Sequence, residues 1–190
     1  MIAGLLLAAG AARRFGGSKL TSPLRGEPLV RHAARSLAEA KCIDAVWVVL
    51  GNDATGVRHA LAGLDVRFVE HSGYLEGLGT SIAVGVEMLP DDCDAVVIAL
   101  GDQPLVPSGA FEALISEWKR TFAHVVATRY RGVVANPVLF ARATFPELRA
   151  LSGDAGARSV VMANPARVRW LDVDAPVPVD IDTPDDLSRL

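Results

Sequence analysis

The stretch "IAGLLLAAGAARRFGGSKL", residues 2–20, decides the fold, because a hydrophobic run passes directly into a loop of glycines and cations. Residues 2–7 show no polar alternation, a pattern typical of a strand that is covered on both faces in a parallel sheet. The glycines that follow let the backbone approach a ligand closely. In open α/β sheets, ligands bind outside the carboxyl ends of the strands, so we expect this loop to lie at a binding site.

The remainder of the chain repeats this alternation of apolar strands and helical patterns. We expect strands at 45–50, 66–70, 95–100, 124–128, 133–140 and 167–173, and helices at 27–39, 55–62, 79–88 and 107–120, then two short helices and a last helical turn. Such alternation predicts a three-layer α/β fold with a mostly parallel central sheet. Because no repeat, low-complexity tract or linker interrupts it, we expect residues 1–190 to form a single domain.

The composition restricts the classes of function. Of the 190 residues, 51% are hydrophobic and 22% are charged, and the formal net charge is −3. This is enough apolar material for a core without disulfides or metals, whereas a general nucleic-acid binder would need a widespread basic surface. Cys42 and Cys93 have no second ligand at metal-like spacing, so both are expected to be reduced thiols.

The opening hydrophobic run also resembles a secretory signal, since it ends in small residues. A signal peptide carries its cations before the apolar run, but here Arg13 and Arg14 follow it. No stretch approaches the roughly 18 uninterrupted apolar residues that span a bilayer. We therefore expect a cytoplasmic protein that binds neither membranes nor nucleic acid.

The glycine loop matches neither of two common phosphate-binding motifs. Gly10, Gly16 and Gly17 do not fit the dinucleotide fingerprint G-x-G-x-x-G. The Walker motif G-x-x-x-x-G-K-[ST] fails as well, because the loop has one residue too many and Ser18 precedes Lys19. If the loop binds phosphate, it uses another arrangement.

Small residues followed by cations are what the loop does offer. Ala8, Ala9 and Gly10 leave room for a base and a sugar, and the cations Arg13, Arg14 and Lys19 come next. This combination suits a nucleoside triphosphate. The alternative, that Gly10 makes a turn and the cations are solvated surface residues, stays open on the loop alone.

A second candidate segment, "GDQP", begins directly after the predicted strand 95–100. Its Asp102 is expected at the same sheet edge as the glycine loop, where one carboxylate suffices for Mg²⁺ when a triphosphate supplies further ligands. Gly101 would leave space for the ligand, and Pro104 would end the strand. Alternatively, Asp102 is a turn residue or the N-cap of the helix after Pro107.

Taken in order, these segments resemble the MobA-like nucleotidyltransferases, and within them the molybdenum cofactor cytidylyltransferases. "LAAGAARRFGGSK" is similar to the family's signature L-A-A-G-x-x-x-R-x-G-x-x-K, "EGLGTSIAVGV" to its nucleoside loop and "GDQPLV" to its metal-binding segment. "ANPVLF", "LSGDAGARSV" and "DIDTPDDL" resemble its later blocks, in the same order. The resemblance implies a three-layer Rossmann-like nucleotidyltransferase fold.

The resemblance also implies roles for individual residues. Arg14 and Lys19 would hold the triphosphate and Asp102 would bind Mg²⁺, which makes these three the expected catalytic groups. The nucleotide-binding residues that it implies are Leu7, Ala8, Ala9, Gly10, Gly16, Gly79, Thr80 and Ser81.

Three further residues are assigned to the acceptor side of the site on the same basis. Asn136 is expected to face the site, and Arg158 to contact the pterin phosphate or to close a structural ion pair. Asp154 is either a second metal-associated carboxylate or the N-cap of a helix that begins near residue 155. Thr183 reads as an N-cap, followed by Pro184 at the first helical position.

The reaction implied is transfer of CMP from CTP to the terminal phosphate of molybdopterin, with release of pyrophosphate and with Mg²⁺ as cofactor. Such a reaction needs positioning and charge cancellation rather than covalent help. A phosphate nucleophile is already ionised, so no histidine base is required, and we interpret His32, His59, His71 and His124 as surface or helix-face residues.

The partners expected are CTP, a phosphorylated pterin acceptor and a client molybdenum hydroxylase. Ala9 is typical of the cytidylyl branch, where the guanylyl branch has glycine. Three alternatives stay open: a guanylyl or sugar-phosphate nucleotidyltransferase, an NAD(P)H-dependent oxidoreductase of the nicotine blue oxidoreductase type, and a non-catalytic carrier of the cofactor.

Overall fold

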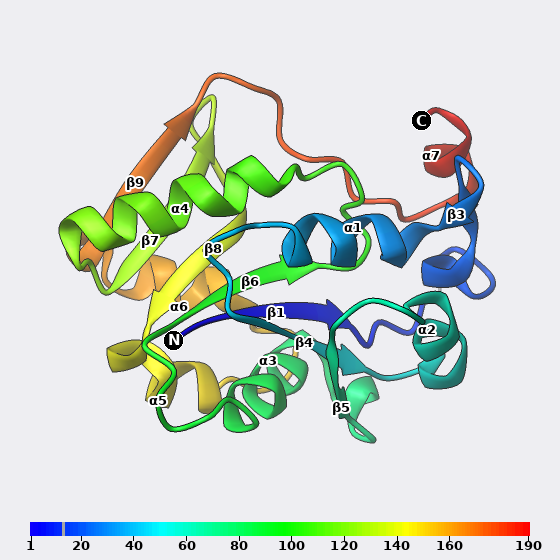
Figure 1. Cartoon of the computed structure of the whole chain (residues 1–190), viewed down its shortest axis with the longest axis horizontal. Coiled ribbons are helices and arrows are strands. Elements are labelled where there is room, and N and C mark those ends of the chain that lie inside the picture. The colour runs from blue at the N-terminus through cyan, green and yellow to red at the C-terminus, as the bar shows by residue number, and fades with distance from the viewer. Residues whose placement is uncertain (13) are drawn as a thin grey trace.

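Seven strands form one sheet at the centre of the computed structural model, which describes residues 1–12 and 14–190 (Figure 1). Their order across the sheet is β5-β4-β1-β6-β8-β7-β9. The bounds are β1 (Ile2–Ala8), β4 (Ala45–Leu50), β5 (Arg67–Glu70), β6 (Ala95–Leu100), β7 (Val125–Tyr130), β8 (Val133–Ala141) and β9 (Val168–Val173). Only β8 runs against its neighbours among these strands, so the mostly parallel sheet is confirmed.

The first strand is buried along its whole length, because it lies inside the sheet and is covered on both faces. It pairs in parallel with β4 and with β6. Leu6 and Ala8 belong to one hydrophobic cluster, whereas Leu5 and Leu7 belong to another. The uninterrupted apolar run of β1 therefore follows from the need to fill two cores at once.

Helices form the outer two layers, as the sequence predicts. The helices α1 (Leu29–Ala38), α2 (Ala54–Ala60) and α4 (Ser108–Thr121) pack on one face, and α3 (Leu78–Glu87), α5 (Phe145–Arg149) and α6 (Ala157–Ala163) on the other. Figure 1 shows α1 and α4 above the sheet and α3 and α5 below it. No described helix is long and apolar enough to cross a membrane, and the thiols of Cys42 and Cys93 are both free.

Two tight turns account for features that periodicity does not predict. Arg131 and Gly132 both have positive φ, 47° and 88°, and the two-residue turn between β7 and β8 makes β8 antiparallel. Arg25 and Gly26, at 52° and 86°, make a similar turn between the short strands β2 (Pro23–Leu24) and β3 (Glu27–Pro28). The helix expected from residue 27 consequently begins at Leu29.

Short 3₁₀ helices complete the connections. Their bounds are η1 (Lys19–Thr21), η2 (Tyr74–Glu76), η3 (Arg142–Thr144) and η4 (Pro165–Arg167). The first follows the glycine loop directly, and the second precedes α3.

Residues 174–183, here called the C-terminal strap, connect β9 to the last helix, α7 (Pro184–Ser188) (Figure 1). Ile181 of the strap is fully buried, and its backbone N–H donates to the carbonyl of Asp102 over 3.0 Å. Thr183 caps α7 through a reciprocal capping box with Asp186, as its sequence predicts. The strap is thereby fastened beside the end of β6.

The strand order reverses between β1 and β6, since β4 and β5 lie on one side and β8, β7 and β9 on the other. The loops that leave such neighbouring strands diverge to opposite faces and open a crevice at the carboxyl edge. The glycine loop follows β1, and the segment with Asp102 follows β6. Both candidate segments therefore meet at this switch point.

Glycine is required where α3 begins. Gly77 has a φ of +116°, and the backbone N–H of Gly79 donates to the carbonyl of Gly153 over 2.8 Å. A Cβ on Gly79 would lie 2.8 Å from the carbonyl oxygen of Ser152 and 2.9 Å from that of Ala155. This close approach fixes the start of α3 against the loop before α6.

We expect the substitution Gly79→Ala to lower the free energy of unfolding by about 1–3 kcal/mol, since the added methyl group collides with backbone atoms that cannot move aside. Urea denaturation would measure the loss. The matched control is Gly109→Ala in α4, where a Cβ would meet nothing within 4 Å. Because alanine favours a helix, the control should gain stability by about 0.5–1 kcal/mol. Equal changes in the two variants would contradict the packing argument.

Candidate functional site

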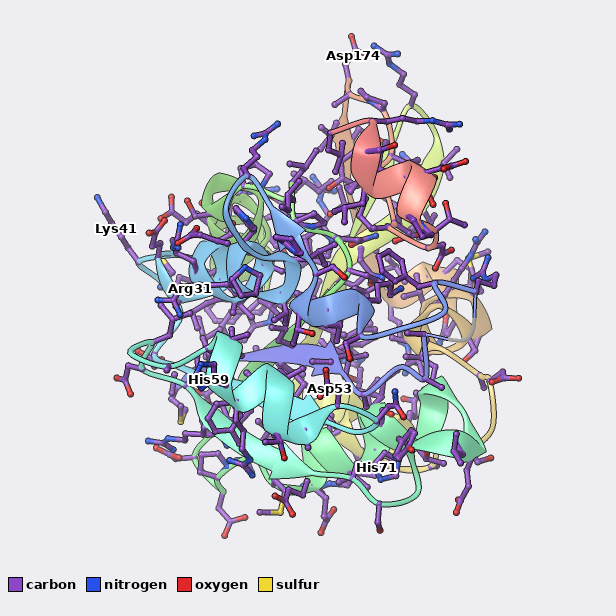
Figure 2. All side chains as sticks on the ribbon, turned by 90° about the vertical axis from the view of Figure 1, so that its right-hand side faces the viewer. Arg31, Lys41, Asp53, His59, His71 and Asp174 are labelled. Atoms are coloured by element: carbon purple, nitrogen blue, oxygen red, sulfur yellow. The ribbon has the colours of Figure 1, made fainter. Side chains whose placement is uncertain are left out.

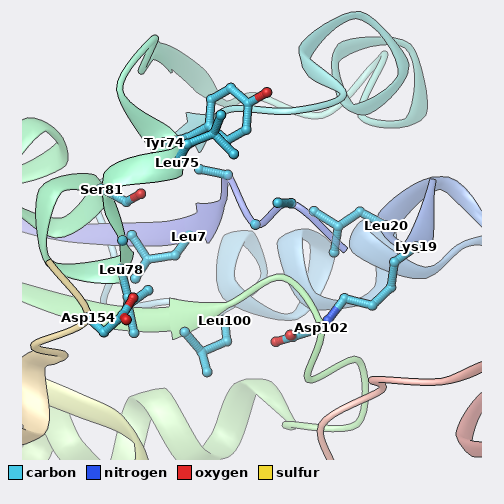
Figure 3. Close-up of a pocket in the computed structure, with 14 residues that line it drawn as sticks. Leu7, Lys19, Leu20, Tyr74, Leu75, Leu78, Ser81, Leu100, Asp102 and Asp154 are labelled. Carbon is cyan, nitrogen blue, oxygen red and sulfur yellow. Dashed lines mark hydrogen bonds and ion pairs between the residues drawn. The ribbon is translucent and has the colours of Figure 1, made fainter. Parts of the chain in front are cut away.

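A pocket of about 400 Å³ opens at the switch point (Figure 3). It is bounded by the ends of β1 and β6, by the glycine loop, by η2 and the start of α3, and by the loop before α6. The residues that line it are Leu7, Ala9, Gly10, Ala11, Lys19, Leu20, Tyr74, Leu75, Gly77, Leu78, Ser81, Leu100, Asp102 and Asp154.

An ion pair between Lys19 and Asp102 joins the two loops at this pocket. The Lys19 Nζ atom donates to the Asp102 carboxylate over 2.7 Å (Figure 3), and only 9% of Lys19 is exposed. Gly101 adds a backbone bond to the carbonyl of Leu7 over 2.9 Å. The N-cap position of α4 is held by Pro107, so the alternative of Asp102 as the N-cap of that helix is wrong.

Asp182 of the C-terminal strap is a third member of this group, although no sequence motif assigns it a role. Its carboxylate lies 3.4 Å from the Lys19 Nζ atom and 2.9 Å from a guanidinium nitrogen of Arg14. The Arg14 side chain is 75% exposed. Arg13, the other arginine of the loop, lies outside the described residues. The two cations expected at the triphosphate thus contact acids from two separate segments, the loop after β6 and the C-terminal strap.

Asp102 and Asp182 are the residues best suited to hold a divalent cation. Both carboxylates approach the same ammonium group and remain partly exposed to solvent, at 25% and 32% of their side chains, and Asp102 lines the pocket. The described part of the chain contains no cluster of three or more Asp, Glu, His or Cys side chains with metal-binding geometry. Two carboxylates beside an open pocket still fit Mg²⁺ or Mn²⁺, which commonly complete their coordination with waters and phosphate oxygens.

The expected nucleotide-binding residues divide into two groups. Leu7, Ala9, Gly10 and Ser81 line the pocket. The other four do not line it: Ala8 is buried, Gly16 makes an exposed turn with a φ of +74°, Gly79 packs against the loop before α6, and the Thr80 hydroxyl donates to the carbonyl of Gly77. The small residues of this group therefore shape the backbone that surrounds the pocket.

The interpretation of His71 as a surface or helix-face residue is wrong. His71 follows β5 and is only 8% exposed, and its Nε2 atom lies 2.9 Å from the hydroxyl oxygen of Thr80 (Figure 2). The Thr80 hydroxyl donates to the carbonyl of Gly77, a residue that lines the pocket. His71 therefore supports the pocket wall from behind, whereas His59 lies on α2 (Figure 2). The position of a histidine after an edge strand gives no sequence signal for this contact.

A second pocket, of about 230 Å³, adjoins the first and shares Leu7, Leu78 and Leu100 with it. Its other lining residues are Ile82, Ile98, Gln103, Val134, Ala135, Asn136, Val138, Gly156, Ala157, Arg158, Val161, Val177 and Asp180. Asn136 and Arg158, both expected on the acceptor side, are thus brought together. Arg158 makes no ion pair with any described residue.

Asp154 lines the first pocket instead, on the wall that carries Leu78, across from Asp102 (Figure 3). The N-cap of α6 is Gly156, so the alternative that Asp154 caps this helix is wrong. Asp182, rather than Asp154, is the carboxylate that shares Lys19 with Asp102.

Asp180 is the remaining acid of the site, and it lies at the second pocket. The side-chain amide of Gln103 donates to its carboxylate over 2.8 Å. Although the residue is accessible to solvent, the protein around it removes water from the carboxyl group, and this desolvation raises the pKa of Asp180. The negative charges of Asp102 and Asp182 act in the same direction.

Comparison with known proteins agrees with the fold of the chain. The model of the MobA-like NTP transferase domain matches residues 4–168. The chain is 29% identical over 166 residues to the purine catabolism protein PucB of Bacillus subtilis, covering 83% of this chain and 79% of that protein. It is 31% identical to nicotine blue oxidoreductase of Paenarthrobacter nicotinovorans, covering 100% and 96%. A probable molybdenum cofactor guanylyltransferase of Thermococcus gammatolerans is 30% identical, covering 71% and 66%.

Among solved structures, the fold is similar to that of Rv0371c from Mycobacterium tuberculosis, with a TM-score of 0.88 and 31% identity over 99% of this chain and 96% of that one. A manganese complex of Rv0371c gives a TM-score of 0.85 and 30% identity, covering 99% and 96%. The family model spans most of the chain, including most of β1, the glycine loop and β6. The chain therefore belongs to the MobA-like NTP transferase family.

Proposed function

We propose that the protein transfers CMP from CTP to the terminal phosphate of a phosphorylated pterin, molybdopterin, and releases pyrophosphate. The observation that carries this proposal is the array of Arg14, Lys19, Asp102 and Asp182, in which Lys19 and Asp102 line the pocket of about 400 Å³. A site that accepts a polyphosphate together with a divalent metal needs cationic side chains for the phosphates and carboxylates for the metal.

The nucleotide would lie along the glycine loop. Ala9, Gly10 and Ser81 offer small side chains and backbone groups to the base and ribose, and the triphosphate would extend toward Lys19 and Arg14. A side chain at Gly10 would meet nothing within 4 Å, so the loop leaves space on this side. The assignment to cytidine rests on the resemblance at Ala9, and guanosine is its nearest rival, since one relative is a probable guanylyltransferase.

Asp102 and Asp182 would hold Mg²⁺, which when bound supplies neutralising charge to the phosphates. Lys19 already cancels part of the charge of both carboxylates, which keeps two acids close together before substrate arrives. Arg14, on the exposed side of Asp182, is free to turn toward an incoming phosphate because most of its side chain is in solvent. The related Rv0371c has been solved with manganese, which favours a divalent ion at this site.

The acceptor would occupy the second pocket, beside Asn136 and Arg158. Its terminal phosphate would reach the first pocket across the shared residues Leu7, Leu78 and Leu100. There a phosphate oxygen attacks the α-phosphorus, the new P–O bond forms, and the bond to pyrophosphate breaks. Since that oxygen is already ionised, the protein's work is to align the groups and to offset their charge.

An oxidoreductase is the second candidate, because nicotine blue oxidoreductase is similar along the whole chain. The group of two cations and two carboxylates, Arg14, Lys19, Asp102 and Asp182, favours nucleotidyl transfer, since hydride transfer needs no paired carboxylates. We retain three expectations as part of the proposal: residues 1–190 act as one domain, the protein is cytoplasmic, and a molybdenum hydroxylase is its client.

The first test is stabilisation by nucleotides. CTP with Mg²⁺ should raise the melting temperature more than GTP, ATP or UTP, because a ligand that binds the native state stabilises it. The four triphosphates, NADH and NADPH would each be screened with and without Mg²⁺. Stabilisation by NADPH without any response to triphosphates would favour the oxidoreductase instead, and a preference for GTP would reassign the base.

The second test is Asp102→Ala. We expect pyrophosphate release to fall by about two to three orders of magnitude, since a group that organises charge in the transition state is lost. Circular dichroism would check that the fold is intact. Near-normal turnover would show that Asp102 does not hold the metal.

The third test separates Asp182 from the other acids of its segment. Asp182→Asn should increase the Mg²⁺ concentration needed for half-maximal pyrophosphate release, because one of two anionic ligands becomes neutral. Asp185→Asn in α7 is the matched control and should leave the Mg²⁺ dependence unchanged. If both variants behave alike, Asp182 has no role in metal binding.

A further inference from the structure

The second pocket is lined largely by apolar side chains. Leu7 and Ile98 face it from the sheet, Ile82 from α3, Val161 from α6 and Val177 from the strap. Such walls give dispersion contacts to the faces of a bound group and offer those faces no hydrogen bonds. A ring that is polar at its edge and apolar on its faces suits such a lining.

One carboxylate of this pocket is held in a fixed position. Gln103 is only 4% exposed, and its side-chain amide donates to the Asp180 Oδ1 atom over 2.8 Å. The neighbouring residue Ile181 is buried and bonded to the carbonyl of Asp102, which fastens the backbone as well. Asp180 therefore presents a prearranged group to a ligand.

The second oxygen of Asp180 has no hydrogen-bond partner among residues 1–12 and 14–190. An ionised carboxylate only accepts hydrogen bonds, so a ligand that binds here must offer N–H or O–H donors. The guanidinium group of Arg158 only donates hydrogen bonds, so the same ligand must also offer an acceptor atom. Asn136 serves either kind of atom.

The ligand must therefore carry hydrogen-bond donors next to an acceptor along the edge of a flat ring. An aminopyrimidinone has this arrangement, since its amino group and ring N–H are donors and its carbonyl oxygen is an acceptor. We propose that Asp180, positioned by Gln103, selects acceptors whose ring presents two adjacent N–H donors. This inference rests on the proposed function, in which the second pocket holds the acceptor. It adds a specificity-determining residue and defines the ring edge that is recognised.

The test uses two bicyclic rings of nearly the same shape, pterin and lumazine. At position 2, pterin carries an amino group and lumazine carries a carbonyl oxygen. Their affinities would be measured by titration calorimetry at neutral pH with CTP and Mg²⁺ present. The native protein should bind pterin at least about tenfold more tightly, since a hydrogen bond to a charged group is worth that factor or more. Lumazine turns an acceptor oxygen toward the carboxylate.

Asp180→Asn should bring the affinity ratio of the two rings close to one, and Gln103→Leu should reduce it part of the way. Asp174→Asn, in the exposed start of the strap (Figure 2), is the matched control and should keep the native ratio. The ratio is informative because a purely structural role of Asp180 would weaken both rings equally.

An unchanged ratio in Asp180→Asn, equal affinities in the native protein, or binding of neither ring would overturn the inference. Stabilisation by CTP separates this failure from that of the proposed function. If the ring test fails while CTP still stabilises both the native protein and Asp180→Asn, only the inference about ring recognition is wrong. If no triphosphate stabilises the native protein, the proposed function fails first.

Discussion

Burial of β1 on both faces is the constraint from which the remaining architecture follows. Leu5 and Leu6 point into opposite cores, so helices must cover both sides of the sheet and parallel strands must flank β1. Once β4 and β6 occupy the two flanks, the chain order reverses beside β1 and a crevice opens at the carboxyl edge. The pocket lies where this packing leaves a space.

The charges at that crevice are balanced before any ligand arrives. Lys19 lies between Asp102 and Asp182, and Arg14 meets Asp182 on the outer side. Removing Lys19 would leave two acids facing each other, whereas a bound polyphosphate and metal would supply new partners to every member. An array of this kind is stable when empty and still able to exchange its partners, as a site for highly charged substrates requires.

Contacts between separate elements of the fold, near or far in the chain, explain what sequence reasoning missed. Asp182 reads as the residue before a helix cap, and its cap partner Thr183 was predicted, yet the strap brings its carboxylate to Lys19 across 163 positions. Asp180 and Gln103 are likewise 77 positions apart. His71 supports Thr80 through a contact nine positions along the chain that no periodic pattern describes. Each contact depends on where the strap or loop is fastened.

The sequence by itself determined the layered α/β architecture, the strands at 45–50 and 95–100, and the meeting of the glycine loop with Asp102, because these follow from local hydrophobic patterns and from the rule that parallel strands end at one edge. Only the tertiary structure decided the reversal of β8, the pairing of Lys19 with two carboxylates, and the second pocket beside Asp180. Turn geometry and long-range packing determine these features, and neither produces a periodic hydrophobic pattern in the sequence.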